Sequence, residues 1–178
     1  MRSLSRHVSG LVSDLTAEYG AIDLVGRRIE CEPRARDAVV EAYEQFGVVG
    51  GAGIRLRDSD DRVLLVQYDG IDGWVDPGTG RRPGESYEEC ACRVLGGVTG
   101  LDASVEGIRQ IHVLYYDDWT ERAPAPSPYV CFTLDSPVSE TSISLDGHAD
   151  DSIERLAWHE ETPVELAYPE LAERSGEK

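Results

Sequence analysis

The chain has 178 residues, enough for the core of one domain, and its 40% hydrophobic and 29% charged content is typical of a globular protein. No stretch of about 18 apolar residues occurs, which excludes a membrane-spanning helix, and the first residues lack the apolar run of a secretory signal. The 34 acidic residues against 17 basic ones give a net charge of -17, which disfavours binding along a nucleic-acid backbone. We therefore expect a cytoplasmic protein that binds neither nucleic acid nor membrane.

Two helices are predicted at the N-terminal end. The first covers residues 6–19 and ends at Gly20, and the second begins at Pro33. The first helix has an apolar stripe that consists of Val8, Leu11, Val12, Leu15 and Tyr19. Neither helix can bury its apolar face alone, so we interpret residues 1–46 as a helical N-terminal extension of a domain at 47–178.

The rest of the chain alternates between predicted strands, loops and helices. Strands are expected at residues 48–56, 62–67, 74–75, 108–116, 129–134 and 153–159, after a short extended segment at 22–29. A Gly- and Pro-containing loop at 76–85 leads into a helix at 86–98, which Gly96-Gly97 would weaken near its end. The three prolines of 117–128 indicate another loop, and 164–174 is predicted to form a closing helix. This pattern predicts an α/β fold.

The order of strand, strand, Pro-Gly loop, helix and three further strands resembles the Nudix fold. The Nudix signature consists of Gly, five residues, Glu, seven residues, Arg-Glu-apolar, one residue, Glu-Glu, one residue and Gly-apolar. Glu85 matches the first Glu, and Arg93 follows at the required distance. The scaffold positions of the motif are represented by Gly78, Gly84, Glu85, Arg93, Leu95, Gly100 and Leu101.

The resemblance covers about residues 47–174. It implies an α/β/α sandwich with a mixed sheet, preceded here by the helical extension. It also implies membership of the Nudix hydrolase superfamily and a relation to enzymes that cleave nucleoside diphosphates linked to another group.

The glutamates with which the family holds metal are unmatched in this placement. Val94 stands in place of the Glu after Arg93, and Gly97-Val98 stands in place of the Glu-Glu pair. Thr79 replaces the first Gly, and Ser152 occurs where some members have a further Glu. Positions 94, 97 and 98 would share one helix face because of their spacing. Hydrolysis with Mg²⁺ needs oxygen ligands, which valine and glycine side chains do not offer.

A few carboxylates could substitute for the missing ligands. The weak metal candidates are Glu85, Glu88 and Glu89. In the family, the Glu matched by Glu85 pairs with the Arg matched by Arg93, and this pair braces the loop. Glu88 and Glu89 fit the first turn of a helix, where the helix dipole favours acidic residues. Asp150 and Asp151 are predicted to lie in a surface loop. We expect no cofactor, or Mg²⁺ or Mn²⁺ if the protein is active.

Arg81 and Arg82 are the candidate ligand-binding residues, because two adjacent guanidinium groups can hold a diphosphate without metal. The alternative is a pair of solvent-exposed arginines. Other candidates with a structural alternative are Trp74, Tyr115 and Tyr116 for base stacking, and His112 and His159 for catalysis. Aromatic and histidine side chains in strands usually belong to the core or the edge of a sheet.

Every basic residue except Lys178 is arginine. Together with the acidic excess, this composition resembles that of proteins from salt-loving archaea, in which molar salt reduces the Debye length to about 3 Å and screens repulsion between like charges. An ordinary acidic protein is the alternative. Cys31, Cys90, Cys92 and Cys131 form no C-x-x-C pair and are expected to be buried and reduced.

Two functions remain open at the level of the sequence. One is a Nudix-fold protein that is catalytically impaired or inactive and retains at most binding of a nucleotide-like small molecule. The alternative is an active Mg²⁺-dependent Nudix hydrolase that uses substitute carboxylates.

Overall fold

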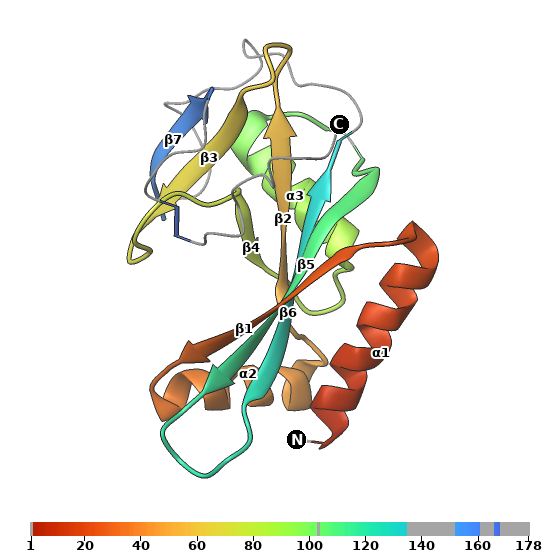
Figure 1. The fold of residues 1–178 in the computed structure, drawn as a ribbon, viewed down its shortest axis with the longest axis vertical. Helices are drawn as coiled ribbons and strands as arrows, with labels where there is room; N and C mark the ends of the chain where they lie inside the picture. The colour runs from red at the N-terminus through yellow and green to blue at the C-terminus, as the bar shows by residue number, and fades with distance from the viewer. Residues whose placement is uncertain (1, 103, 135–151, 161–165, 168–178) are drawn as a thin grey trace.

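The computed structural model describes residues 2–102, 104–134, 152–160 and 166–167. Its elements are, in chain order, α1 (Arg2–Tyr19), β1 (Asp23–Glu30), α2 (Pro33–Phe46), β2 (Gly51–Arg57), β3 (Val63–Tyr68), β4 (Gly78–Gly80), α3 (Tyr87–Thr99), β5 (Gly107–Asp117), β6 (Ala125–Thr133) and β7 (Ile153–His159). The expected α/β class and the N-terminal helices are confirmed (Figure 1). No helix within the described ranges is long and apolar enough to cross a bilayer.

The strands of the described ranges form a seven-stranded mixed sheet. Its order is β1-β5-β6-β2-β3-β7, and β4 pairs with β2 beside this path. The pairs β1–β5 and β2–β6 are parallel, whereas the other pairs are antiparallel. The segment before residue 47 therefore supplies an edge strand of the sheet in addition to its two helices (Figure 1).

The two faces of β5 have different surroundings because side chains alternate along a strand. Ile111 and Val113 lie in a buried apolar cluster together with Leu4, Val8 and Leu15 of α1. His112, Leu114 and Tyr116 face the other way and line a cavity. A second buried cluster joins α3 to the strands β2, β3 and β7 through Val94, Leu95, Val98, Ile54, Leu56, Leu64, Val66, Ile153 and Leu156. α1 and α3 thus both help to bury the sheet.

The third strand lies elsewhere than expected. Trp74 and Val75 make only isolated bridges, whereas Gly78–Gly80, inside the predicted loop, forms β4. Gly51 pairs with Gly80 in this short antiparallel ladder, and a Cβ atom built on Gly51 would lie 2.3 Å from the carbonyl oxygen of Thr79. The close approach of the two backbones requires glycine, and sequence periodicity does not reveal it.

β6 begins at Ala125, within the segment predicted to be a loop because of its prolines. Pro126 and Pro128 pair with β5, but β2 joins the other edge of β6 only from Tyr129 onward. The two prolines are two positions apart and face the same way, so their missing N–H groups can both point away from β5 toward the free edge. The prediction of a loop over the whole of 117–128 was therefore wrong.

The other helices agree with expectation in most respects. α2 begins with Pro33 in its first turn and ends at Gly47 in the left-handed conformation. α3 continues through Gly96-Gly97 to Thr99 and ends at Gly100, so the helix does not end early at the glycine pair. The predicted closing helix at 164–174, like Asp150 and Asp151, lies outside the described residues.

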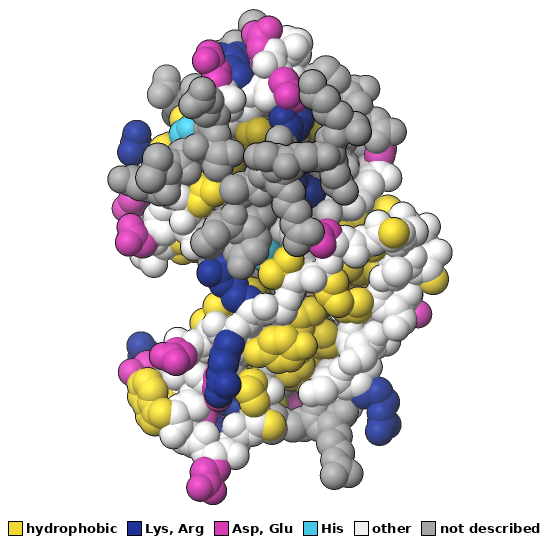
Figure 2. Space-filling model, in the orientation of Figure 1, with side chains coloured by type: hydrophobic (Ala, Val, Ile, Leu, Met, Phe, Trp, Pro, Cys, Tyr) yellow, Lys and Arg dark blue, Asp and Glu magenta, His cyan; other side chains and the backbone are white. Residues whose placement is uncertain are grey.

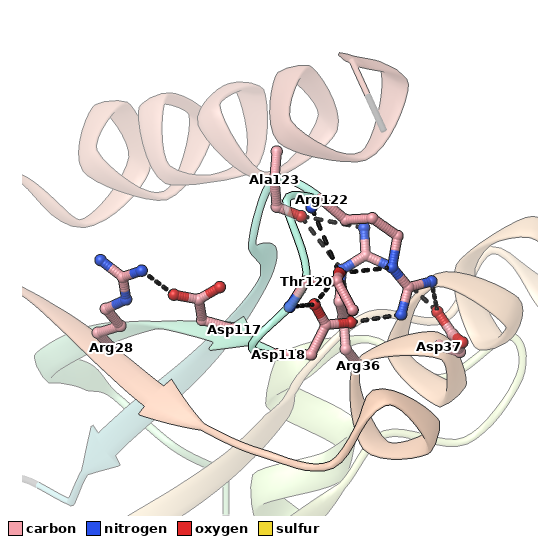
Figure 3. A network of polar contacts seen from close by, with 8 residues as sticks. All are labelled: Arg28, Arg36, Asp37, Asp117, Asp118, Thr120, Arg122 and Ala123. Carbon is pink, nitrogen blue, oxygen red and sulfur yellow. Dashed lines mark hydrogen bonds and ion pairs between the residues drawn. The ribbon is translucent and has the colours of Figure 1, made fainter.

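A polar network ties α2 to the loop between β5 and β6 (Figure 3). The buried Arg36 guanidinium donates to the carbonyl oxygen of Ala123 at 3.0 and 3.2 Å and pairs with Asp37 at 3.0 Å. Arg122 pairs with Asp37 at 2.6 Å and also with Asp118. These contacts position α2 over the strands that carry the cavity.

Candidate functional site

The loop before α3 is held by the start of that helix. Ser86 caps the helix, and its side chain accepts from the backbone N–H of Glu89 at 3.1 Å. The Glu89 carboxylate in turn accepts from the backbone N–H of Ser86 at 2.7 Å, which completes a capping box. Glu88 accepts a hydrogen bond of 3.2 Å from the Tyr19 hydroxyl of α1. Both acidic candidates in this turn therefore have structural contacts.

Glu85 and Arg93 form the ion pair that the resemblance implied. Arg93 donates to the two carboxylate oxygens at 2.7 and 2.8 Å, and the backbone N–H of Arg82 adds a third bond of 2.8 Å. Hydrogen bonding from Arg93 lowers the pKa of Glu85 to about 2, against the desolvation of the carboxylate. Arg93 also donates to the carbonyl oxygen of Gly80 at 3.1 Å, so the pair braces β4 against α3.

Arg81 and Arg82 have different surroundings. Arg81 donates to the carbonyl oxygen of Glu85 at 2.9 Å and stacks over the ring of Tyr87, with 4.2 Å from guanidinium carbon to ring centroid. Arg82 is exposed, and its backbone, not its side chain, contacts Glu85. Neither residue lines the cavity. The structure does not bring the two guanidinium groups to a common pocket.

Two of the three unmatched motif positions, Val94 and Val98, lie on the inner side of α3. Val94 is 7% exposed and Val98 is 6% exposed, and both belong to the apolar cluster with Val75 and Leu156. A Cβ atom on Gly97 would meet no atom within 4 Å. A carboxylate at position 94 or 98 would be surrounded by apolar side chains, whereas one at position 97 would have free space.

Metal donors do not converge here. Within the described ranges, no three His, Cys, Asp or Glu side chains are grouped so that they could hold a metal ion. The described residues at this site thus do not fit the divalent metal that the resemblance implies. The Glu85 carboxylate is paired with Arg93, and the Glu89 carboxylate accepts a hydrogen bond in the cap of α3.

A cavity of about 640 Å³ lies on the opposite side of β5 from the first cluster. One wall comes from β1 and α2, with Arg27, Ala38, Val39 and Ala42, and another comes from the chain around Tyr68, Asp69 and Ile71. Figure 2 shows the surface hollowed between the part that carries β1 and α2 and the part that carries β3 and β7. This volume is within the range of pockets that take a small molecule.

Asp76 lines the cavity and belongs to a buried ion pair that the sequence analysis did not predict. Arg55 donates to Asp76 through Nη2 at 2.9 Å and Nε at 2.5 Å, and the two side chains are 5% and 1% exposed. The Cys131 thiol lies 3.5 Å from the same carboxylate. The signal in the sequence was the arginine between Ile54 and Leu56 in a mainly apolar strand, together with an aspartate directly before Pro77-Gly78.

Two tyrosines position Gly78, one of the motif's scaffold residues. The Tyr68 hydroxyl donates to the carbonyl oxygen of Gly78 at 2.8 Å and accepts from its N–H at 2.9 Å. The Tyr129 hydroxyl lies so close that a Cβ atom on Gly78 would be 1.6 Å from it, and one on Gly53 would be 2.0 Å from it. Glycine at both positions is therefore required by space rather than by backbone angle.

The remaining candidates separate into cavity and core residues. His112 and Tyr116 line the cavity, and Tyr115 is 41% exposed on the other side of β5. Trp74 is buried, and its ring centroid lies 4.5 Å from that of His159 in an edge-to-face contact. Burial lowers the pKa of His159. All four cysteines are free, but only Cys90 and Cys131 are fully buried, so the expectation of four buried cysteines was wrong for Cys31 and Cys92.

Comparison with known proteins identifies one family. A family model described as the NUDIX domain matches residues 49–176. Among solved structures, a NUDIX hydrolase from Nitrosomonas europaea is 23% identical, with a TM-score of 0.44 over 63% of this chain and 72% of that one. A MutT protein from Bacillus halodurans is 23% identical, with a TM-score of 0.44 over 63% of this chain and 68% of that one. An Ap4A hydrolase from C. elegans is 20% identical, with a TM-score of 0.42 over 63% and 80%. No curated protein sequence matches the chain.

Proposed function

Because this chain belongs to the Nudix family, we propose that it keeps the Nudix fold as a binding module for a nucleotide-like small molecule and that its phosphoanhydride hydrolase activity is impaired or absent. One observation carries this proposal. Val94 and Val98, at two positions where the family motif has glutamate, are buried among apolar side chains of the core. A side chain in that environment neither ligates Mg²⁺ nor activates water.

The substitute carboxylates support the same conclusion. Glu85 already accepts three hydrogen bonds, and Arg93 competes with any cation for it. Glu89 is engaged in the capping box, and Glu88 accepts from Tyr19. Recruiting one of these residues to a metal would break a contact that holds the loop or the start of α3.

The cavity supports the binding half of the proposal. Its walls are mainly apolar, with a few polar groups such as Asp76, His112 and Ser127, which is the usual composition of a small-molecule site. Tyr116 lies in its wall and offers an aromatic face to a planar group. The cavity is lined partly by α2, so residues before the matched family region contribute to it.

Calorimetric titration with Mn²⁺, followed by assay of ADP-ribose and nucleoside triphosphates, tests the catalytic half. We expect no saturable stoichiometric site and no metal-dependent product. The triple variant Val94→Glu, Gly97→Glu, Val98→Glu is the matched comparison, since it restores the family's carboxylates on one face of α3. It should lose stability in chelator and regain part of it with Mn²⁺. One stoichiometric Mn²⁺ site in the unmodified protein would contradict the proposal.

Binding of ADP-ribose in the presence of chelator tests the other half. Ala42→Phe adds an aromatic ring to the cavity wall on α2 and should weaken binding at least about tenfold. Glu41→Phe adds the same ring at an exposed neighbouring position and should leave binding unchanged. Equal affinities of the two variants would show that the cavity is not the binding site.

An active hydrolase is the second candidate, favoured by membership of the family alone. It requires at least two carboxylates to leave their present partners and converge on a metal. Mn²⁺-dependent hydrolysis that is lost in Glu88→Gln, in a variant that remains folded, would establish it.

A further inference from the structure

We propose that Arg27 of β1 and Ser127 of β6, on either side of β5, bind the phosphate group of the ligand at one end of the cavity, without a metal ion. This inference rests on the proposed function, because it states how the same cavity orients a nucleotide-like molecule. β1 precedes the residues that the family model matches. The phosphate would therefore be bound in part by a segment that the family motif does not include.

The first observation is the distribution of charge around the cavity. Within the described ranges, Arg27 is the only lysine or arginine that lines it. Two acidic residues also line it, but Asp76 is paired with the buried Arg55, and Asp69 is exposed to solvent. An arginine presents its N–H donors in a planar fork that matches phosphate oxygens. Phosphate oxygens can share this guanidinium with the contacts that it already makes within the chain.

The second observation is a buried hydroxyl group. Ser127 is 8% exposed and lines the same cavity. Its side chain forms no hydrogen bond with any residue that the structure describes. The hydroxyl of so buried a residue usually has a partner, because it can both donate and accept. A phosphate oxygen in the cavity would supply the acceptor.

Strand pairing brings these two residues to the same level of the sheet. Leu114 of β5 pairs with Arg27 on one side and with Ser127 on the other (Figure 1). Adjacent strands lie about 5 Å apart, so the Cα atoms of Arg27 and Ser127 are separated by about 10 Å. All three residues line the cavity, which places their side chains on one face. A phosphate group beside Leu114 can thus contact the long arginine side chain and the short serine side chain together.

His112 adds a third polar group at this end of the cavity. It precedes Leu114 by two residues, so both side chains lie on the cavity face of β5. It is 6% exposed, and it pairs with Tyr129, which follows Ser127 by two residues on β6. An imidazole N–H can donate a further hydrogen bond to a phosphate oxygen.

The Asp76 carboxylate lies toward the other end of the cavity. The Cys131 thiol is 3.5 Å from it, and Cys131 follows Ser127 by four residues on β6. Four residues of a strand span about 13 Å, so a phosphate beside Ser127 is kept away from this negative charge. The ligand is therefore expected to bind with its phosphate at β1 and its uncharged part toward Asp76.

The test compares ADP-ribose with adenosine, which lacks the phosphates, by calorimetry in the presence of chelator. Arg27→Gln should weaken ADP-ribose binding at least about tenfold, because it removes a charged donor. Ser127→Ala should weaken it about threefold to tenfold through loss of one hydrogen bond. Neither variant should change adenosine binding. Ser127→Ala removes a single oxygen atom, which covers the case that Arg27→Gln does not fold.

Arg28→Gln is the matched control. Arg28 is the next residue of β1, and its side chain faces the other side of the sheet and is 72% exposed. This variant should bind ADP-ribose as tightly as the unmodified protein. Equal ADP-ribose affinities of all three variants and the unmodified protein would overturn the phosphate site. The proposed function would then still stand, because the cavity would bind ADP-ribose by other contacts.

Inorganic phosphate alone decides the case in which ADP-ribose does not bind. The unmodified protein and Arg28→Gln should melt at a higher temperature in potassium phosphate than in potassium chloride of equal ionic strength. Arg27→Gln and Ser127→Ala should lose at least about half of this difference. Such a result would retain the phosphate site while the nucleotide-like ligand is rejected. The same difference in all four proteins would assign the effect to the general action of the salt, and it would overturn the site, as would no difference at all.

Discussion

The Glu85 carboxylate connects the loop, β4 and α3 through one side chain. It accepts from Arg93 and from the backbone of Arg82, and Arg93 reaches on to Gly80. The resemblance implied this pair, because the matching Glu and Arg of the family brace the loop against the helix. The pair keeps the geometry of the loop whether or not a metal is bound there.

Glu85→Gln should lower the free energy of unfolding by about 1–2 kcal/mol at pH 7, since it removes a charged acceptor from a guanidinium. The pKa of Glu85 is lowered from 4.5 to about 2 on folding, so this contribution is present above about pH 4.5 and is lost as the pH falls toward 2. Urea unfolding of both proteins between pH 7 and pH 2.5 measures the difference. Glu41→Gln, at an exposed position of α2, is the control and should show no such convergence.

Gly78 and Gly80 lie two residues apart on β4 but differ in the space around them. A Cβ atom at Gly78 would overlap the Tyr129 hydroxyl, whereas one at Gly80 would meet nothing within 4 Å. Gly78→Ala should therefore lower the free energy of unfolding by about 2–3 kcal/mol, and Gly80→Ala by less than about 1 kcal/mol. Thermal melting of the two variants compares them. Equal losses would place the Tyr129 hydroxyl elsewhere, and Tyr129→Phe should recover part of the loss in Gly78→Ala.

Two glycines of α3 and its C-terminal cap should respond differently to replacement by alanine. Gly97 has free space and helical backbone, whereas Gly100 ends the helix with φ of 71°. Gly97→Ala should raise the free energy of unfolding by about 0.5–1 kcal/mol through helix propensity. Gly100→Ala should lower it by about 1 kcal/mol because of its left-handed conformation. Chemical unfolding of this pair checks the helix boundary, and a stabilising Gly100→Ala would show that α3 ends elsewhere.

α1 is part of the core as well as of the N-terminal extension. Leu15 is 5% exposed in the cluster under the sheet, whereas Leu24 on β1 is 54% exposed. Leu15→Ala should lower the free energy of unfolding by about 2–4 kcal/mol, and Leu24→Ala should change it by less than about 0.5 kcal/mol. We propose on this ground that residues 1–46 fold together with the rest of the chain. A second, independent unfolding transition that alone responds to Leu15→Ala would show that they form a separate unit.

The charge of the whole molecule sets its response to salt. With a net charge of -17 and a single lysine, repulsion among carboxylates opposes the folded state in dilute buffer. Melting temperature should rise by several degrees between about 0.05 M and 2 M KCl as this repulsion is screened. The same rise in NaCl would assign the effect to screening rather than to the cation. A flat or falling curve would contradict the interpretation that this composition is an adaptation to high salt. It would not contradict the assignment of the fold.

The sequence alone determined what depends on local spacing. Helical periodicity placed α1 and α2, the Gly- and Pro-containing loop marked the approach to α3, and the resemblance to the family implied the ion pair of Glu85 and Arg93. These features follow from contacts within one or two turns of the chain, where residue type and distance along the sequence decide the outcome.

Only the tertiary structure decided which groups from distant segments meet. β1 joins β5, β4 forms inside a predicted loop, and Arg55, Asp76 and Cys131 come together from three separate parts of the chain. Arg81 and Arg82 were predicted to share a ligand because they are adjacent in the sequence. Adjacent side chains can point in different directions, however, and the Arg81 guanidinium stacks on the ring of Tyr87. Strand pairing and burial depend on the register between segments tens of residues apart, which local pattern does not encode. For this reason the cavity was visible only after the sheet had been assembled.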